Sequence, residues 1–301
     1  MSDPNRLVAA SAPGLFVLLW STGYLGAKAG LPYAEPFTLL FLRFVLALLL
    51  LAPLAMWLKP AMAMPLRERA HLMASGLLLH GVYLGGVFAA IGLGMSAGLT
   101  ALIVGAQPLL TSLAAPWLFG ERPRLAHWVG LLLGFGGIAL ILGGGADADV
   151  ALPALLAAVA ALVGITAGTL YQKRFCAQHD LLAVTVHQYL PTVVLFGAAA
   201  LLFETREVAW TAQFVAALLW LVLALSLGAI LLLAFLIKHG EASKVASLFY
   251  LVPPVTAVMA WLLFDESLGG LKIAGIALVA LGVWLVMRRP APIRPEGPQA
   301  P

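Results

Sequence analysis

The stretch AGLTALIVGAQPLLTSLAAPWLFGE, residues 97–121, returns 145 positions later as ASKVASLFYLVPPVTAVMAWLLFDE, residues 242–266. Eight positions are identical at this offset without a gap, and the informative matches are Pro108/Pro253, Thr111/Thr256, Phe119/Phe264 and Glu121/Glu266. The same offset continues on both sides, through Gly23/Gly168, Lys28/Lys173, Gly130/Gly275 and Gly137/Gly282. A repeat that covers about half the chain each time is typical of transporters built from internal structural repeats.

Each copy of this stretch is predicted to be a membrane-spanning helix of about 22 residues with a proline near its middle. The prolines are Pro108 in the first copy and Pro253, followed by Pro254, in the second. Because proline lacks an amide hydrogen and its ring clashes with the carbonyl four residues back, each helix is expected to kink and to free the carbonyls of Val104 and Phe249. Two breaks at matching depth predict a central site. Kinks that only shape helix packing are the alternative.

The composition identifies an integral membrane protein. Of the 301 residues, 62% are hydrophobic and 10% charged, with a mean hydropathy of +1.02, whereas a soluble domain is about 45–50% apolar and about 25% charged. The single cysteine, Cys176, excludes an internal disulfide and gives no metal-site spacing. The first apolar stretch is too long for a signal-peptide core, which predicts a retained first helix.

Cutting the chain at proline, glycine and charge clusters, with about 20 apolar residues per span, predicts ten transmembrane helices. Their ranges are 11–31, 36–57, 70–94, 97–119, 125–143, 152–173, 181–203, 213–237, 243–264 and 269–288. The expected fold is all-α: two five-helix halves, residues 1–145 and 146–290, around a central cavity. The Pro-rich residues 291–301 are predicted to be a disordered cytoplasmic tail.

The distribution of basic residues predicts the orientation of the chain. With the amino terminus inside, thirteen of the 17 Lys and Arg residues lie on the cytoplasmic side, and only Lys28, Arg206 and Lys272 lie on the other. The positive-inside rule therefore places both termini in the cytoplasm. Because each half has an odd number of spans, the second half is inserted upside down relative to the first.

These features together resemble the EamA family of the drug/metabolite transporter superfamily over essentially the whole chain. The resemblance rests on ten spans, two inverted halves, and a proline-centred fourth helix in each half that ends in WLFGE or LLFDE. Within the superfamily the sequence most resembles the YddG-like amino-acid exporters. The resemblance implies a basket of helices 1, 3, 4, 6, 8 and 9 around a central cavity, with helices 5 and 10 at the periphery. It also implies alternating access, which opens the cavity to one side at a time.

The lack of acidic residues in the middle of the predicted spans narrows the class of solute. All thirteen acidic residues fall in predicted loops, tails or helix ends, and none lies in the middle of a span. Carboxylates within the membrane are the usual proton relays and cation sites, so their absence disfavours a cation-selective antiporter. A neutral or zwitterionic solute fits better, because backbone groups at broken helices offer partial charges of both signs.

Two pairs of side chains are the first candidates for binding such a solute. His80 lies near the middle of the third predicted span, with Tyr83 one turn later on the same face. An ionisable ring at that depth is expected to face a cavity or a partner; a neutral histidine bonded between helices is the alternative. Trp20 and Tyr24 form a similar pair in the first span, too deep for a belt residue at the headgroups, with core packing as the alternative.

Further candidates stand at the helix breaks or carry hydroxyls inside the spans: Gln107, Thr166, Ser226, Phe249 and Tyr250. Serine and threonine in spans more often bond their own helix or a neighbouring one.

Three more polar positions have structural alternatives. Arg43 is matched by Gln188 at the 145 offset, and gating or lining of the site by Arg43 competes with snorkelling toward the membrane surface. Glu266, like Glu121, is expected to be structural and to stabilise the amino-terminal end of the helix that follows it.

The sequence therefore predicts a transporter, not an enzyme, that exports neutral and aromatic amino acids and related metabolites across the bacterial inner membrane. Export of other neutral metabolites, nucleosides or drugs is the alternative. A membrane enzyme or a lipid-handling scaffold is more remote, because the sequence offers no catalytic residues: no mid-membrane carboxylate pair, metal cluster or nucleophile elbow. The expected partners are a small solute and the lipid bilayer, with no cofactor, metal or nucleic acid. Monomer and homodimer both stay open.

Overall fold

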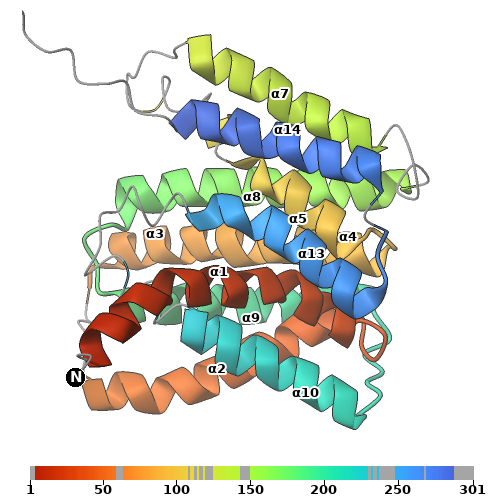
Figure 1. Cartoon of the computed structure of the whole chain (residues 1–301). Coiled ribbons are helices and arrows are strands. Elements are labelled where there is room, and N and C mark those ends of the chain that lie inside the picture. The colour runs from red at the N-terminus through yellow and green to blue at the C-terminus, as the bar shows by residue number, and fades with distance from the viewer. Residues whose placement is uncertain are drawn as a thin grey trace, which may run out of the picture.

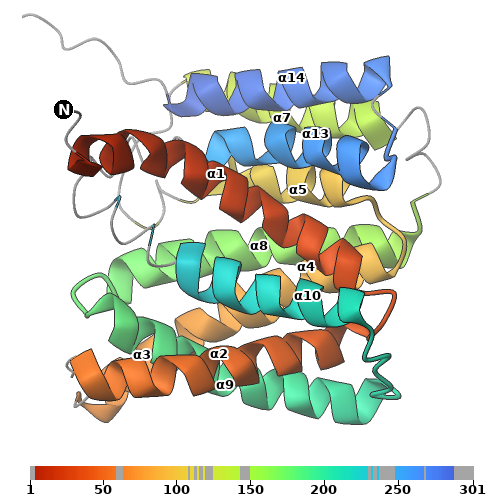
Figure 2. The same ribbon diagram turned by 60° about the horizontal axis from the view of Figure 1, so that its bottom comes forward.

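The computed structural model describes residues 4–58, 64–107, 109–111, 125–142, 150–229, 248–267 and 269–287, with isolated positions at 114, 118, 232 and 236. These residues form a bundle of helices (Figures 1 and 2). The α-helices are α1 (Pro4–Gly30), α2 (Pro36–Leu58), α3 (Leu66–Gly76), α4 (Tyr83–Gly92), α5 (Ala97–Gly105), α7 (Leu125–Leu142), α8 (Leu152–Phe175), α9 (Leu181–Phe203), α10 (Ala212–Trp220), α13 (Val252–Phe264) and α14 (Gly270–Met287). Two π-helical segments, η1 (Leu77–Val82) and η2 (Leu221–Ala229), and one 3₁₀ turn, η3 (Phe249–Leu251), complete them.

The predicted all-α class is confirmed. Within the described residues the only β-type pairing is one isolated bridge, between Ala34 and Val208. Among the described residues, five helical segments are long and apolar enough to cross a membrane, and four shorter apolar helices accompany them. The five are Pro36–Leu58, Leu66–Gly92, Leu152–Phe175, Leu181–Phe203 and Ala212–Ala229. The predicted spans 97–119, 213–237 and 243–264 and the tail fall partly or wholly outside the described residues, so the count of ten stays a prediction.

The outer surface of the bundle is apolar. Large hydrophobic side chains stand well exposed at many points, among them Trp57, Leu132, Val194 and Leu202. A soluble protein rarely exposes such a continuous apolar exterior. In a bilayer the same surface is satisfied by lipid tails, because the helices keep their backbone hydrogen bonds internal.

Helices that occupy the same place in the two predicted halves pack against each other. This holds for α2 with α9, α5 with α13 and α7 with α14. Both views show α7 and α14 side by side at one edge of the bundle, with α2 and α9 toward the other (Figures 1 and 2). The peripheral position of α7 and α14 agrees with the place that the family resemblance gives to helices 5 and 10.

The contact between α7 and α14 is built from glycines that the 145 offset relates. A Cβ atom added at Gly137 would lie 2.6 Å from the carbonyl oxygen of Gly275, and one added at Gly282 would collide with the carbonyl of Gly130. The two contacts are equivalent, because the 145 offset relates residue 137 to residue 282 and residue 130 to residue 275. Reciprocal contacts of this kind are what a two-fold axis produces. Without side chains at these positions, the two backbones approach closely.

The helix breaks differ in detail from the expected mid-helix kinks. Pro253 and Pro254 stand in the first turn of α13, where proline is tolerated because its missing amide would have no partner. The 3₁₀ turn η3 comes directly before them, and the Phe249 carbonyl, expected to be freed, accepts a hydrogen bond from the amide of Val252. In the first half, α5 ends at Gly105, and Pro108 lies outside the described residues. The ring of Pro253 packs directly over Gly105.

The glycine contact gives a stability prediction with a control on the next residue. Gly137→Ala places a methyl group against the α14 backbone, which cannot move aside cheaply, and such overpacking costs about 1–3 kcal/mol. Gly136→Ala meets nothing within 4 Å and gains helix propensity. In detergent, thermal unfolding is expected at a lower temperature for Gly137→Ala and at an unchanged or higher one for Gly136→Ala. Equal midpoints would show that α7 and α14 do not approach this closely.

Candidate functional site

Buried polar side chains gather where α1, α2, η1, α9 and η2 meet. Arg43 on α2 is 6% exposed and Gln188 on α9 is 5% exposed, so both are interior residues. The expectation that Arg43 could snorkel to the membrane surface is therefore not met. Ser226, in η2, is also buried. These positions define the candidate site, here called the central cluster: Tyr24, Arg43, Ser75, His80, Tyr83, Gln188, Tyr189 and Ser226.

The two in-span residues that the 145 offset relates make equivalent bonds across the bundle. Arg43 donates from Nε to the hydroxyl of Ser226 in η2, at 3.0 Å. The Gln188 oxygen lies 3.3 Å from Nε2 of His80 in η1. Each side chain thus crosses from its own predicted half to the π-helical segment of the other.

The π-helical segments themselves stand at related positions. Shifting η1, residues 77–82, by 145 gives 222–227, which lies inside η2. A π-helical turn widens the helix and loosens its regular hydrogen bonding, and such turns are frequent at functional sites. Here η1 carries His80 and η2 carries Ser226.

Tyrosine hydroxyls line the same region. The hydroxyl oxygens of Tyr24 and Tyr83 are 3.4 Å apart, so the two predicted pairs meet through these groups. Tyr189 donates to the Ser226 carbonyl at 3.3 Å, and its ring packs edge-on against Phe44 with centroids 4.8 Å apart. The His80 ring packs against both of them, with its centroid 5.5 Å from that of Phe44 and 5.0 Å from that of Tyr189.

A separate aromatic group joins the first and last thirds of the chain. The Trp20 ring lies 5.4 Å from Phe16 and 5.1 Å from Phe249, centroid to centroid. Trp20 also packs against the cluster that contains Tyr24. The predicted aromatic residues of helices 1 and 9 are therefore together, next to the polar residues.

Several predicted residues lie elsewhere. Gln107 donates to the hydroxyl of Thr169 on α8, and Thr166 bonds the Leu162 carbonyl of its own helix, which was the structural alternative for hydroxyls in spans. Pro254 lines a small crevice beside Gly105 rather than the central cluster. The side chain of Tyr250 lies outside the described residues.

The sequence analysis missed two members of the central cluster, Tyr189 and Ser75, and a third residue that packs against it, Phe44. The 145 offset could have identified Phe44 and Tyr189, because these two are related to each other just as Arg43 is related to Gln188. Ser75 accepts a bond from the Gln188 amide at 3.0 Å, and no periodicity in the sequence marks it. The cluster therefore draws on helices 2 and 7, which the family resemblance left out of the basket, and none of its eight residues comes from the described parts of helices 4, 6 and 9.

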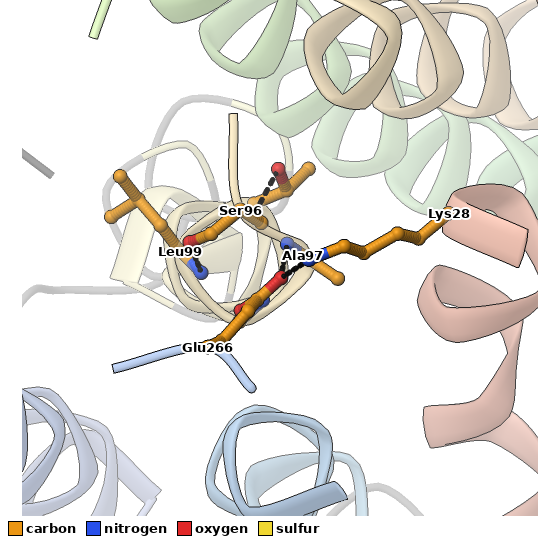
Figure 3. A network of polar contacts seen from close by, with 7 residues as sticks. Lys28, Ser96, Ala97, Leu99 and Glu266 are labelled. Atoms are coloured by element: carbon orange, nitrogen blue, oxygen red, sulfur yellow. Dashed lines mark hydrogen bonds and ion pairs between the residues drawn. The ribbon is translucent and has the colours of Figure 1, made fainter. Parts of the chain in front are cut away.

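A second polar network fastens one end of the bundle. Figure 3 shows the Glu266 carboxylate at the start of α5, with Lys28 approaching from α1. Oε1 accepts from Lys28 Nζ at 2.6 Å and from the Ala97 amide at 2.8 Å, and Oε2 accepts from the Gly98 amide at 3.2 Å. The carboxylate caps the first turn of α5, where amides lack partners within the helix. The expectation that Glu266 serves the helix after it is wrong, because α5 of the other half presents those amides instead.

Two loop carboxylates act at the same end. Glu204, after α9, accepts bonds from the amides of Phe37 and Thr38 at 2.7 Å, which caps α2. Glu35 in turn accepts from the amide and hydroxyl of Thr205 at 2.7 Å. The loops of the two predicted halves are thus bonded to each other where α1 ends and α2 begins.

Comparison with known proteins identifies the class. The model of the EamA-like transporter family matches residues 14–143 and, a second time, residues 152–288. The chain belongs to this family. It is an integral membrane transporter and not an enzyme, as the sequence predicts.

The relatives are full-length matches at low identity. An uncharacterized transporter of Bacillus subtilis, YvbV, is 30% identical over 274 residues, which are 90% of this chain and 88% of that protein. A probable amino-acid metabolite efflux pump of Escherichia coli is 25% identical over 90% of this chain and 92% of its own. YedA, an uncharacterized inner membrane transporter of E. coli, is 28% identical over 88% and 84%. A crystal structure with 24% identity superposes with a TM-score of 0.66 over 91% of this chain and 94% of its own, which supports the fold.

The Glu266 network predicts a pH dependence of stability. Burial acts to raise the pKa of Glu266, but the hydrogen bond and charge of Lys28 and the amides of Ala97 and Gly98 outweigh it and hold the pKa below its usual value of 4.5. A lowered pKa in the folded state stabilises the fold above the usual value, and that contribution is lost as the pH falls through the lowered pKa.

Thermal unfolding from neutral pH into the acid range tests this. Glu266→Gln is expected to unfold at a lower temperature at pH about 7 and to lose less than wild type on acidification. Glu207→Gln, which neutralises an exposed carboxylate of the loop after α9, is the control and should follow wild type. Parallel curves for all three proteins would mean that the network contributes nothing to the fold.

Proposed function

We propose that this protein exports neutral and aromatic amino acids and closely related metabolites across the bacterial inner membrane by alternating access. The printed name of the E. coli efflux pump supports the solute class. The observation that carries the proposal is the central cluster, where hydroxyls, an imidazole, an amide and a guanidinium converge inside an otherwise apolar bundle. Polar side chains inside a membrane are costly and mark solute pathways.

The aromatic residues beside the cluster suit a large apolar side chain. Trp20 and Phe249 form a wall next to Tyr24 and Tyr83, and solute sites of this kind combine apolar walls with a few placed polar groups. An aromatic or branched side chain would pack on the rings. The polar backbone part of an amino acid would face the hydroxyls and His80.

The movement that we propose is a rocking of the two halves, residues 1–145 and 146–290, inserted in opposite orientation. The Lys28–Glu266 network and the Glu35 and Glu204 contacts bridge the halves at one end, and these bonds must open when the site faces that side. The π-helical segments η1 and η2 are the places where the helices deform. Without an ATP-binding motif in the sequence, a solute or ion gradient drives the cycle.

The orientation is tested with reporters that are active on only one side of the membrane. Fusions at the carboxy terminus and after residue 147 should give opposite signals, with the carboxy terminus in the cytoplasm, because thirteen of the 17 basic residues then face inward. The same signal from both fusions would overturn the odd number of spans per half and the inversion.

The solute class is tested in proteoliposomes with labelled amino acids, one nucleoside and one cationic drug. We expect the amino acids with large apolar side chains to move fastest. His80→Gln keeps a hydrogen-bonding group toward Gln188 and should retain partial transport, while His80→Leu should weaken apparent affinity about tenfold or more. Preferred transport of the nucleoside or drug would contradict the amino-acid assignment. Equal rates in both His80 variants would remove His80 from the site.

A further inference from the structure

Among the described residues, the buried guanidinium of Arg43 has no acidic partner. In the described part of the chain the ion pairs within 4.0 Å are Lys28–Glu266 and His179–Glu68, and neither involves Arg43. The sequence agrees, because none of its thirteen acidic residues stands in the middle of a predicted span. An arginine keeps its charge in proteins, and an unpaired charge in a low-dielectric interior is strongly unfavourable.

Only one of the five N–H groups of the guanidinium has a hydrogen-bond acceptor among the described residues. Nε donates to Ser226, whose hydroxyl in turn donates to the Leu221 carbonyl at 3.2 Å, so the serine oxygen is oriented to accept. The terminal nitrogens Nη1 and Nη2 make no hydrogen bond to a described residue, although the Arg43 side chain is buried. They are the donors that remain available to a ligand.

The described side chains near the Arg43 guanidinium are neutral. The Arg43 charge acts on Tyr83, Tyr189 and His80, which places these three side chains within electrostatic range. The ring of Phe44 lies 5.5 Å from the guanidinium carbon and compensates a small part of the charge. None of these supplies the planar pair of anionic oxygens that a guanidinium binds best.

The related position in the other half shows that the fold does not require a charge there. Gln188 is neutral, and both ends of its amide are satisfied: the oxygen with His80 and the nitrogen with Ser75. It has the same place in its helix and crosses to the opposite π-helical segment in the same way, and both its oxygen and its nitrogen have a hydrogen-bond partner. The charge and the free donors at position 43 therefore require another explanation than packing.

We infer that Arg43, positioned by Ser226, binds the carboxylate of the transported solute through its two terminal nitrogens. The solute class is thereby narrowed to molecules that carry a carboxylate, which supplies the missing counter-ion when it enters. Cations, and neutral solutes without an anionic group, are disfavoured because they leave the buried charge uncompensated. This inference rests on the proposed function and adds which atom group of the solute is recognised and by which residue.

The test compares solutes that differ only in the carboxylate. Wild-type protein in proteoliposomes is offered phenylalanine against phenylalaninamide, and 3-phenylpropionate against 3-phenylpropionamide. Both acids are expected to have an apparent KM at least about tenfold below that of their amides, as a charge-assisted bond gives. Equal KM values for acid and amide in wild type would overturn the inference, and this comparison needs no variant.

Variants then assign the preference to Arg43. Arg43→Gln should raise the KM of the acids about tenfold to hundredfold while the amides stay near their wild-type values, so the acid preference disappears. Arg43→Lys keeps the charge without the paired donors and should fall between. Arg69→Gln, on the exposed start of α3, is the matched control and should behave as wild type. A loss of acid and amide transport by the same factor in Arg43→Gln would show a structural role and overturn the inference.

The outcomes separate this inference from the proposed function. Transport of phenylalanine with no discrimination against its amide would leave amino-acid export standing and remove the role of Arg43. Transport of 3-phenylpropionate but not of phenylalanine would leave the role of Arg43 standing and contradict amino-acid export. Failure to move any of the four solutes would contradict both.

Discussion

A guanidinium inside a membrane bundle must be offset by acceptors or by a counter-ion, because an isolated charge there is among the most costly groups that a fold can hold. In this protein Arg43 carries that charge. Among the described residues only its Nε has a hydrogen-bond acceptor, Ser226, in the other predicted half of the chain. The rest of the central cluster is arranged around that residue. Ser226 orients it, Tyr189 bonds the backbone of the same π-helical turn, and Phe44 stacks below the charge.

The internal repeat explains why the cluster stands where it does. Residues 43–44 and 188–189 are related by the offset, and their helices pack against each other, so Phe44 meets Tyr189 across the contact. Arg43 and Gln188 then point to η2 and η1 respectively. The repeat provides two equivalent positions, and different residues occupy them. Gln188 is neutral and bonded to His80 and Ser75, whereas Arg43 is charged and bonded, among the described residues, through Nε alone.

Much of the fold could be predicted from the sequence, because the relevant signals are periodic or compositional. The helix at 181–203 begins and ends as expected, since Asp180 caps its start with two side-chain bonds and Glu204 follows its end. The offset marked the related positions Gly130/Gly275, Gly137/Gly282 and Arg43/Gln188, but it did not predict that these glycines form the contact between α7 and α14. What it left open was geometry across helices: a single buried serine such as Ser75 carries no pattern. The capping of α5 by Glu266 likewise depends on which helix end lies nearby, not on which follows in the chain.

The prolines show the same limit of prediction from sequence. Their sequence context correctly marked a break in the ninth predicted helix, yet the break is a 3₁₀ turn before α13 that satisfies the carbonyl expected to be free. A local hydrogen bond thus satisfies an acceptor that the sequence analysis expected to be free. The proposed solute site therefore relies on side chains rather than on this carbonyl.

An experimental structure of the protein with a transported amino acid bound is the most direct measurement of the central claim. The account predicts the solute between the two halves, its carboxylate within about 3 Å of the Arg43 terminal nitrogens, as charge-assisted bonds of this type require, and its side chain against Trp20 and Phe249. A solute bound elsewhere, for example in the crevice beside Gly105 and Pro253, with Arg43 still bonded only to Ser226, would contradict it.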